Sequence, residues 1–133
     1  MKELEYNAKI AVMRILNDIV NADNVVKDVE VNYMNEVAST FELADNYLNE
    51  VNNLVTLQAL SIVRALSADV KEKIAQLMGK MIVIDEDINY NEVKLYNAVC
   101  ESCNIEKDFN LEDYPDYTLS GTFVNQEDLM NDI

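Results

Sequence analysis

Residues 77–96 read LMGKMIVIDEDINYNEVKLY, which is an apolar helical run, a short acidic turn and the start of a second helix. The same plan occurs 62 positions earlier, where residues 15–34 read ILNDIVNADNVVKDVEVNYM. Apolar positions match at this offset on both sides of the turn, as in the pair Ile15 and Leu77. The sequence therefore predicts two pseudo-repeated helix–turn–helix units packed around one core.

The composition favours helices throughout. Half of the 133 residues are hydrophobic, which is enough for a core, and only 2 Gly and 1 Pro are present to make the turns that sheet-rich folds need. Leu, Ala, Met, Glu and Lys fill the periodic segments. We expect an all-α fold, a single compact helical domain of about six to seven helices.

Hydrophobic periodicity places these helices along the chain. The predicted helices cover about residues 2–22, 28–41, 45–55, 57–66, 68–84 and 90–103. Asn52 and Asn53 are the weakest point, where we expect a kink or a split. Ser67 and Asn89 are suitable N-caps. Gly79 lies inside a helix, and a close crossing with another helix would explain it.

We expect residues 1–105 to form the domain and residues 106–133 to form an acidic C-terminal arm. The arm holds eight acids, one base and four aromatic residues. The aromatic residues predict that it docks on the domain, with a short final helix near residues 126–130. They are Phe109, Tyr114, Tyr117 and Phe123.

The charge limits the class of partner. The net charge is −15, which would repel nucleic acid and anionic membrane surfaces. Residues 28–63 contain six acids and no base, so a protein partner with a basic surface fits better. The start of the chain lacks a signal pattern and no apolar run is long enough to span a bilayer, so we expect a cytoplasmic protein without membrane insertion. The sequence does not indicate an oligomeric state.

No catalytic constellation is evident. The chain has no histidine, no phosphate-binding glycine loop and no nucleophile elbow, so we predict that it is not an enzyme. Cys100 and Cys103 form a C-x-x-C pair, but no second pair or histidine completes a zinc site. We interpret both as structural thiols near the end of a helix.

The acids of the two turns have two interpretations. In each copy an aspartate ends the apolar run and a glutamate follows seven positions later. Asn89 and Glu92 resemble a capping box, whereas Lys27 is a poor cap for the helix that contains Glu30. The aspartates could close their turns by accepting hydrogen bonds from the free N–H groups of the next helix. Alternatively, the four acids bind Ca²⁺ or Mg²⁺, because clustered carboxylates repel unless protonated or bridged. They are Asp23, Glu30, Asp85 and Glu92.

An EF-hand is excluded. The oxygen-bearing residues of this loop have the right spacing from Asp85 to Asn91, but the required Gly is Tyr90 and the required final Glu is Tyr96. The metal hypothesis therefore rests on the acids of the two turns rather than on a known calcium loop.

These turns resemble the tellurite-resistance TerB family, which includes N-terminal domains of some DnaJ-like co-chaperones. The family pattern is A-D-G-x-[IV]-x-x-x-E after an apolar helix. The two copies here read ADNVVKDVE at residues 22–30 and IDEDINYNE at residues 84–92, and residues 65–73, ALSADVKEK, are similar to the segment before the second family copy. The resemblance implies a compact all-α cytoplasmic domain with an acidic face, for which metal binding and a stress-response scaffold role have been proposed.

The chain departs from this pattern at the glycine. Asn24 replaces it in the first copy and Glu86 in the second. Asn tolerates the left-handed conformation that glycine adopts, but Glu does so poorly, so we expect the second turn to differ in geometry. Two functional hypotheses remain: a non-catalytic interaction module, and a divalent-cation-binding protein.

Overall fold

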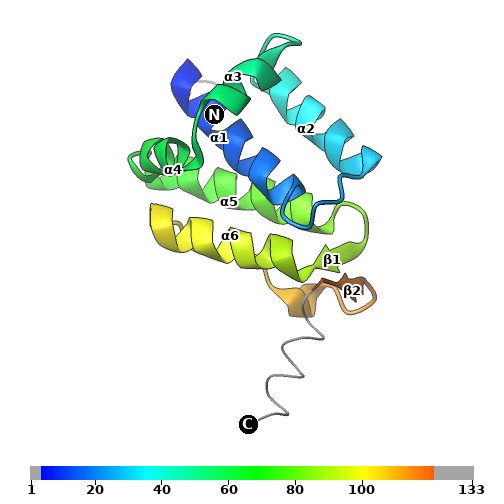
Figure 1. Ribbon diagram of the computed structural model, residues 1–133. Coiled ribbons are helices and arrows are strands. Elements are labelled where there is room, and N and C mark those ends of the chain that lie inside the picture. Colours follow the sequence, from blue (N-terminus) through cyan, green and yellow to red (C-terminus); the bar gives the residue numbers. More distant parts are fainter. Residues whose placement is uncertain (1–3, 122–133) are drawn as a thin grey trace.

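The computed structural model describes residues 4–121. The all-α prediction is confirmed, because six α-helices form one domain in this part of the chain (Figure 1). The α-helices are α1 (Tyr6–Val20), α2 (Asp28–Thr40), α3 (Tyr47–Asn53), α4 (Thr56–Arg64), α5 (Ala68–Val83) and α6 (Tyr90–Cys103). A 3₁₀ turn, η1 (Leu111–Asp113), and two short strands, β1 (Asp87–Asn89) and β2 (Thr118–Ser120), were not expected.

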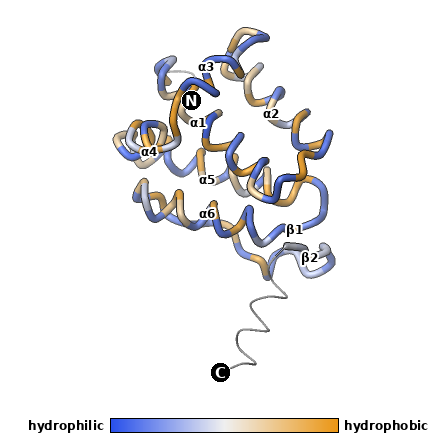
Figure 2. Tube along the Cα trace, in the orientation of Figure 1, coloured by the Kyte–Doolittle hydropathy of each residue, from blue (hydrophilic) through white to orange (hydrophobic). Residues whose placement is uncertain are grey.

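Helix α1 is the centre of the core. It contacts each of the other five α-helices, and hydrophobic residues run along it and along its neighbours (Figure 2). Leu16, Met13 and Ile19 are completely buried. Each such side chain contributes roughly 1.5–3 kcal/mol when it leaves water. The other helices pack around α1 through their own apolar stripes, which is why a sequence with few turn residues folds into one body.

Most predicted helix boundaries agree with the structure. Helix α6 has the predicted bounds, and Ser67 caps α5 by accepting the N–H of Val70 at 3.3 Å. The predicted split near Asn52 and Asn53 occurs one residue later, where Leu54 is extended and separates α3 from α4. The break turns α4 so that it packs along α1.

The prediction for Gly79 is wrong. A Cβ atom built at this position would meet nothing within 4 Å, apart from its own helix and chain neighbours. No close helix crossing therefore requires the glycine, and its place in α5 has no packing explanation.

The backbone confirms the internal repeat in an unexpected way. Among residues 4–121, the non-glycine residues with positive φ are Asn24 (62°), Glu42 (60°), Glu86 (61°) and Asn104 (59°). They form two pairs, and 62 positions separate the members of each pair. The expectation that the Glu86 turn would differ from the Asn24 turn is wrong, because the surrounding turn imposes the left-handed conformation on both residues.

The second pair ends equivalent helices. After Glu42, the N–H of Leu43 bonds to the carbonyl of Ala38 at 3.0 Å. After Asn104, the N–H of Ile105 bonds in the same way to the carbonyl of Cys100 at 2.8 Å. Each left-handed residue thus closes a helix C-terminus, and the two hairpins have the same construction from turn to cap.

Residues 106–121 lie against α6 and the second turn. Phe109 stacks on Tyr114, the ring of Tyr117 lies tilted against Tyr114, and all three side chains pack on the core. Strand β2 pairs in parallel with β1, with Ile88 opposite Leu119. This segment therefore binds the turn between α5 and α6. The predicted docking of Phe123 and the short helix near residues 126–130 lie outside the described residues.

No helix within residues 4–121 combines the length and the apolar character that crossing a membrane would require.

Candidate functional site

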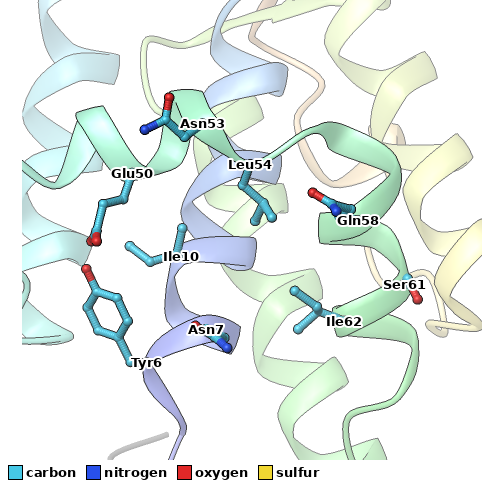
Figure 3. A pocket seen from close by; sticks show the side chains of 9 residues that line it. All are labelled: Tyr6, Asn7, Ile10, Glu50, Asn53, Leu54, Gln58, Ser61 and Ile62. Atoms are coloured by element: carbon cyan, nitrogen blue, oxygen red, sulfur yellow. The ribbon is translucent and has the colours of Figure 1, made fainter.

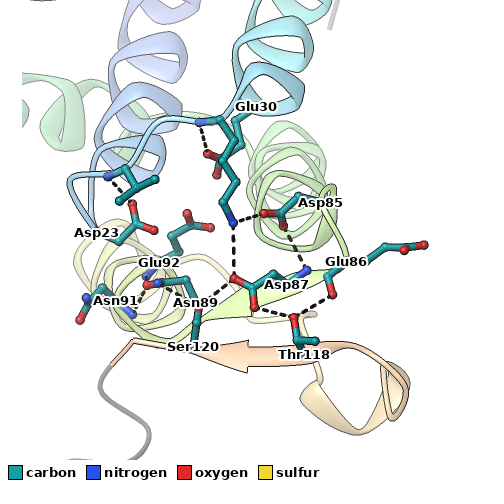
Figure 4. A network of polar contacts seen from close by, with 12 residues as sticks. Asp23, Glu30, Asp85, Glu86, Asp87, Asn89, Asn91, Glu92, Thr118 and Ser120 are labelled. Atoms are coloured by element: carbon teal, nitrogen blue, oxygen red, sulfur yellow. Dashed lines mark hydrogen bonds and ion pairs between the residues drawn. The ribbon is translucent and has the colours of Figure 1, made fainter.

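The two acidic turns come together at one end of the domain (Figure 4). The structure brings both aspartates within electrostatic reach of both glutamates, because the charges of Asp23 and Asp85 affect the pKa values of Glu30 and Glu92. The first turns of α2 and α6 present the glutamates, and the loops before those helices present the aspartates. The pseudo-repeat thus creates a single site from both halves of the chain.

Each aspartate closes its own turn. The Oδ1 atom of Asp23 accepts the N–H of Val25 at 3.0 Å, and Oδ1 of Asp85 accepts the N–H of Asp87 at 3.2 Å. The left-handed residue lies between donor and acceptor in both turns. This is the Asx-turn geometry, in which a short carboxylate replaces a backbone acceptor. The turn-closing role of the aspartates is therefore confirmed, but the expected donors are wrong, because Val25 and Asp87 precede α2 and α6 rather than lie in those helices.

The two glutamates are buried and lie against each other. Only 2% of Glu30 and 3% of Glu92 is exposed. The Oε1 atom of Glu30 accepts the N–H of Lys27 at 3.1 Å, so Glu30 supports the start of α2 although the Lys27 side chain is no cap. At the start of α6, Oδ1 of Asn89 accepts the N–H of Asn91 at 2.8 Å, as predicted for an N-cap.

Burial changes the protonation of this pair. It raises the pKa of Glu92 to about 9, and the neighbouring Glu30 carboxylate adds to the effect. Burial also raises the pKa of Glu30, although the N–H of Lys27 and a hydrogen bond with Glu92 oppose this. Glu92 therefore keeps its proton at neutral pH and donates a hydrogen bond to the Glu30 carboxylate.

Lys27 connects the two turns. Its ammonium group contacts the carboxylate of Asp85 and lies 3.4 Å from Oδ2 of Asp87. The hydrogen bond and charge of Asp85 raise the pKa of Lys27 to about 12, so the ammonium stays charged. A base from the first repeat thus pairs with two aspartates of the second repeat.

Sequence reasoning missed the role of Lys27. A signal was present, because Lys27 is the only base between Arg14 and Arg64 and it lies inside an acidic turn. A base placed among acids is attracted to one of their carboxylates. The identity of that partner depends on the packing of the two hairpins, which the sequence does not show.

Strand β2 completes the site from the other side. The hydroxyl of Thr118 donates to Oδ1 of Asp87 at 2.6 Å, and the hydroxyl of Ser120 donates to Oδ2 at 2.7 Å. Burial opposes the charge of Asp87, but these hydroxyls and Lys27 outweigh it and hold the pKa of Asp87 below its ordinary value. Asp87 is therefore the point at which the C-terminal segment and both repeats meet.

The site as arranged does not form a coordination sphere. Within residues 4–121, no three His, Cys, Asp or Glu side chains lie in positions that could hold a metal ion. The Lys27 ammonium supplies positive charge at Asp85, and a shared proton reduces the repulsion between Glu30 and Glu92. The binding of Ca²⁺ or Mg²⁺ by the four acids stays a prediction.

The two cysteines are free and buried, as their structural interpretation requires. Burial raises the pKa of the Cys100 thiol to about 11 and also raises that of Cys103. The Cys103 thiol donates to the carbonyl of Leu60 at 3.4 Å. A thiol that holds its proton is a poor nucleophile, so neither residue has the properties of a reactive cysteine.

Fold and site together define an all-α domain of two helix–turn–helix pseudo-repeats with a buried glutamate pair at their junction. No protein-family model and no curated protein matches the chain. The crystal structure of a protein of unknown function, PG1108 from Porphyromonas gingivalis W83, is similar, with a TM-score of 0.70 and 20% identity over 80% of this chain and 90% of that chain. At this identity the likeness shows the fold alone, and membership of the TerB family stays a hypothesis.

Proposed function

We propose that the chain is a non-catalytic, acidic interaction module that binds a protein partner through a basic surface of that partner. One observation carries this proposal: residues 28–63, which span α2, α3 and all of α4 except its last residue, Arg64, contain no base, and most of their acids are exposed. The exposed acids are Asp28, Glu36, Glu42, Asp45 and Glu50. A surface of one sign attracts partners of the opposite sign and repels others.

Chemistry at the acidic turns is a weaker explanation. The Glu30 carboxylate accepts the backbone N–H of Lys27, and Glu92 is hydrogen-bonded to Glu30. Both carboxyl groups with raised pKa values therefore already have partners within the fold. A general acid or base must reach a substrate proton, and these side chains are almost completely buried. The buried thiols are protonated as well. These features support a non-catalytic role.

We include in this proposal a cytoplasmic location and a scaffold role in a stress response such as tellurite resistance. Both follow from the resemblance of the two turns to the TerB pattern. The observed fold agrees with the compact helical domain that this resemblance implies.

An affinity capture at low and high salt tests the proposal. The immobilised wild type is compared with a variant in which Glu36, Glu42 and Glu50 become Lys, and with a control variant in which the exposed Glu101, Glu106 and Glu112 become Lys. We expect basic proteins to bind wild type and control at low salt, and to be lost at high salt or with the first variant. Partners retained equally under all conditions would overturn the electrostatic proposal.

We propose divalent-cation binding as the second candidate. The observation that favours it is that burial and the charges of Asp23 and Asp85 raise the pKa values of both Glu30 and Glu92, although no three of the described acids lie in positions that could hold a metal ion in the domain as it stands. A cation there would have to displace the proton of Glu92 and move the Lys27 ammonium away from Asp85.

Calorimetry with Ca²⁺ and Mg²⁺ decides this second candidate. Asp23→Asn and Asp85→Asn should weaken binding, and Lys27→Met should strengthen it because the competing ammonium is gone. Proton release should accompany binding, which heats measured in buffers of different ionisation enthalpy detect. No heat at millimolar cation, from wild type or from Lys27→Met, would exclude this function.

A further inference from the structure

A groove of about 560 Å³ opens between the start of α1, the end of α3 and the side of α4 (Figure 3). It lies away from the acidic turns and shares no lining residue with them. Ile10, Leu54 and Ile62 supply its apolar surface, and Leu54 and Ile62 point toward its middle. Tyr6 and Glu50 form one end, and Gln58 lies toward the other.

Apolar surface continues beyond this groove. Tyr6 is 49% exposed, and the neighbouring residues Val55 and Leu57 are 57% and 79% exposed. Leu57 lies one helical turn before Ser61, a lining residue of α4, so it borders the groove. A contiguous apolar surface with a polar rim is typical of a protein interaction site, and this one extends further than a small ligand in the groove would cover.

The charge that lines the groove is negative. Among residues 4–121, Glu50 is the only charged one that lines it. The two bases of α1 are engaged elsewhere: Lys9 donates to the carbonyl of Phe41 at 3.0 Å, and Arg14 pairs with Asp18 at 3.2 Å. A basic residue on a partner would therefore find, at the end of an apolar groove, a carboxylate that no base within residues 4–121 pairs with.

We infer that this groove binds an amphipathic helix of a partner protein, with apolar residues in the groove and a Lys or Arg at Glu50. The inference rests on the proposed interaction function and names its surface. A groove between helices accepts the i, i+3, i+4 and i+7 side chains of a docked helix. A second copy of this chain is disfavoured by its net charge of −15, and residues 122–133, with three acids and no base, are disfavoured by the same repulsion.

The probe is a fluorescent helical peptide of Leu and Lys at amphipathic spacing, with Leu/Glu and Leu/Ser peptides of the same pattern as controls. Anisotropy measures binding to the full chain, and amide NMR shifts locate it. We expect the Leu/Lys peptide to bind best and to perturb the amides of Tyr6, Leu54 and Ile62. Leu57→Ser, which removes apolar contact area, and Glu50→Lys, which places like charges together, should each weaken it about tenfold.

Matched variants away from the groove provide the controls. Val31→Ser on α2 removes an apolar side chain that is 41% exposed, and Glu112→Lys in η1 reverses an exposed acid, yet neither residue lines the groove. Both should bind the peptide like wild type. Circular dichroism of all four variants shows that they fold, since each changes an exposed side chain.

Each other outcome has a definite meaning. Binding that maps to α2 or to the acidic turns would overturn the groove but keep the acidic interaction module. Equal binding of the Leu/Ser peptide would overturn the role of Glu50. Self-association that Leu57→Ser abolishes would assign the groove to a second copy and overturn the inference. No binding of the Leu/Lys peptide anywhere would count against both the groove and the proposed function.

Discussion

Glu30 and Glu92 lie against each other in the core, although 62 residues separate them in the chain. Each is the third residue of the helix that follows an acidic turn. Because the two helix starts meet, the internal repeat brings two carboxyl groups together in the core. Two buried carboxylates cannot both be charged at low cost, and a proton on Glu92 resolves the conflict. Because this proton is bound only in the folded state, the stability of the domain depends on pH.

We expect Glu92→Gln to stabilise the domain at alkaline pH. Folding raises the pKa of Glu92 from 4.5 to about 9, so the folded chain holds a proton that the unfolded chain releases. The stability present below pH 4.5 is therefore lost as the pH rises toward 9. Gln keeps the hydrogen bond without this loss. The free energy of unfolding of the Glu92→Gln variant should match that of wild type near pH 4.5 and exceed it by about 1–3 kcal/mol at pH 8.

Urea unfolding over this pH range provides the measurement. Glu36→Gln, on the exposed side of α2, is the control and should follow wild type at each pH. A Glu92→Gln variant that is less stable than wild type at every pH would show that Glu92 is charged in the folded state.

Lys27→Met should destabilise the domain by roughly 1 kcal/mol. The ammonium binds Asp85 and Asp87, and its removal leaves carboxylates without a counter-charge. The Lys27 side chain is 37% exposed, so water weakens the pair and the loss should shrink as salt is added. Thermal unfolding at several salt concentrations measures the effect.

Lys107→Met is the matched control for this change. Lys107 pairs with Glu101 at 3.1 Å, but the two side chains are 42% and 70% exposed. Exposed pairs contribute about 0–1 kcal/mol, so this variant should be close to wild type. Equal losses in the two variants would show that Lys27 makes no special connection between the repeats.

Local patterns determined most of what the sequence could predict. Apolar periodicity gave the helices, and side chains that bond to nearby N–H groups gave the caps at Ser67 and Asn89. The matching aspartates indicated equivalent turns because an Asx turn involves only residues close in sequence. Such features require no knowledge of how the helices pack.

The features that sequence reasoning missed depend on distant contacts. Strand β1 pairs with residues 31 positions later, and three residues of β2 are too few for a strand pattern. Lys27 reaches Asp85 across 58 positions. The expectation at Gly79 failed for a related reason, since a glycine in a sequence does not reveal the space around its Cα.

The free space around the Cα of Gly79 permits a stabilising substitution. Gly79→Ala should raise the free energy of unfolding by about 0.5–1 kcal/mol, because Ala loses less backbone entropy inside a helix and its Cβ meets no atom. Urea unfolding measures the change. Gly121→Ala is the contrast: its φ is 82° and a Cβ there would lie 3.1 Å from the backbone nitrogen of Tyr90, so it should destabilise the β2 end.

The attachment of the C-terminal segment depends on the hydroxyl of Tyr96. It accepts the N–H groups of Asp108 and Phe109 at 2.9 Å and 3.1 Å, and it bonds to Oδ1 of Asp108 at 3.1 Å. Tyr96→Phe keeps the buried ring and removes these bonds. We expect a loss of about 1–3 kcal/mol, since two backbone donors lose their acceptor.

The loss should also be local. Strand β2 holds Asp87 only while the segment stays in place, so the amides of β2 should exchange faster in Tyr96→Phe than those of α1. Tyr114→Phe is the control, because it keeps the ring stacked 5.8 Å from Phe109. Hydrogen exchange separates the possibilities: uniform acceleration in both regions would mean that Tyr96 stabilises the whole domain, and unchanged exchange in β2 would mean that its hydroxyl does not hold the segment.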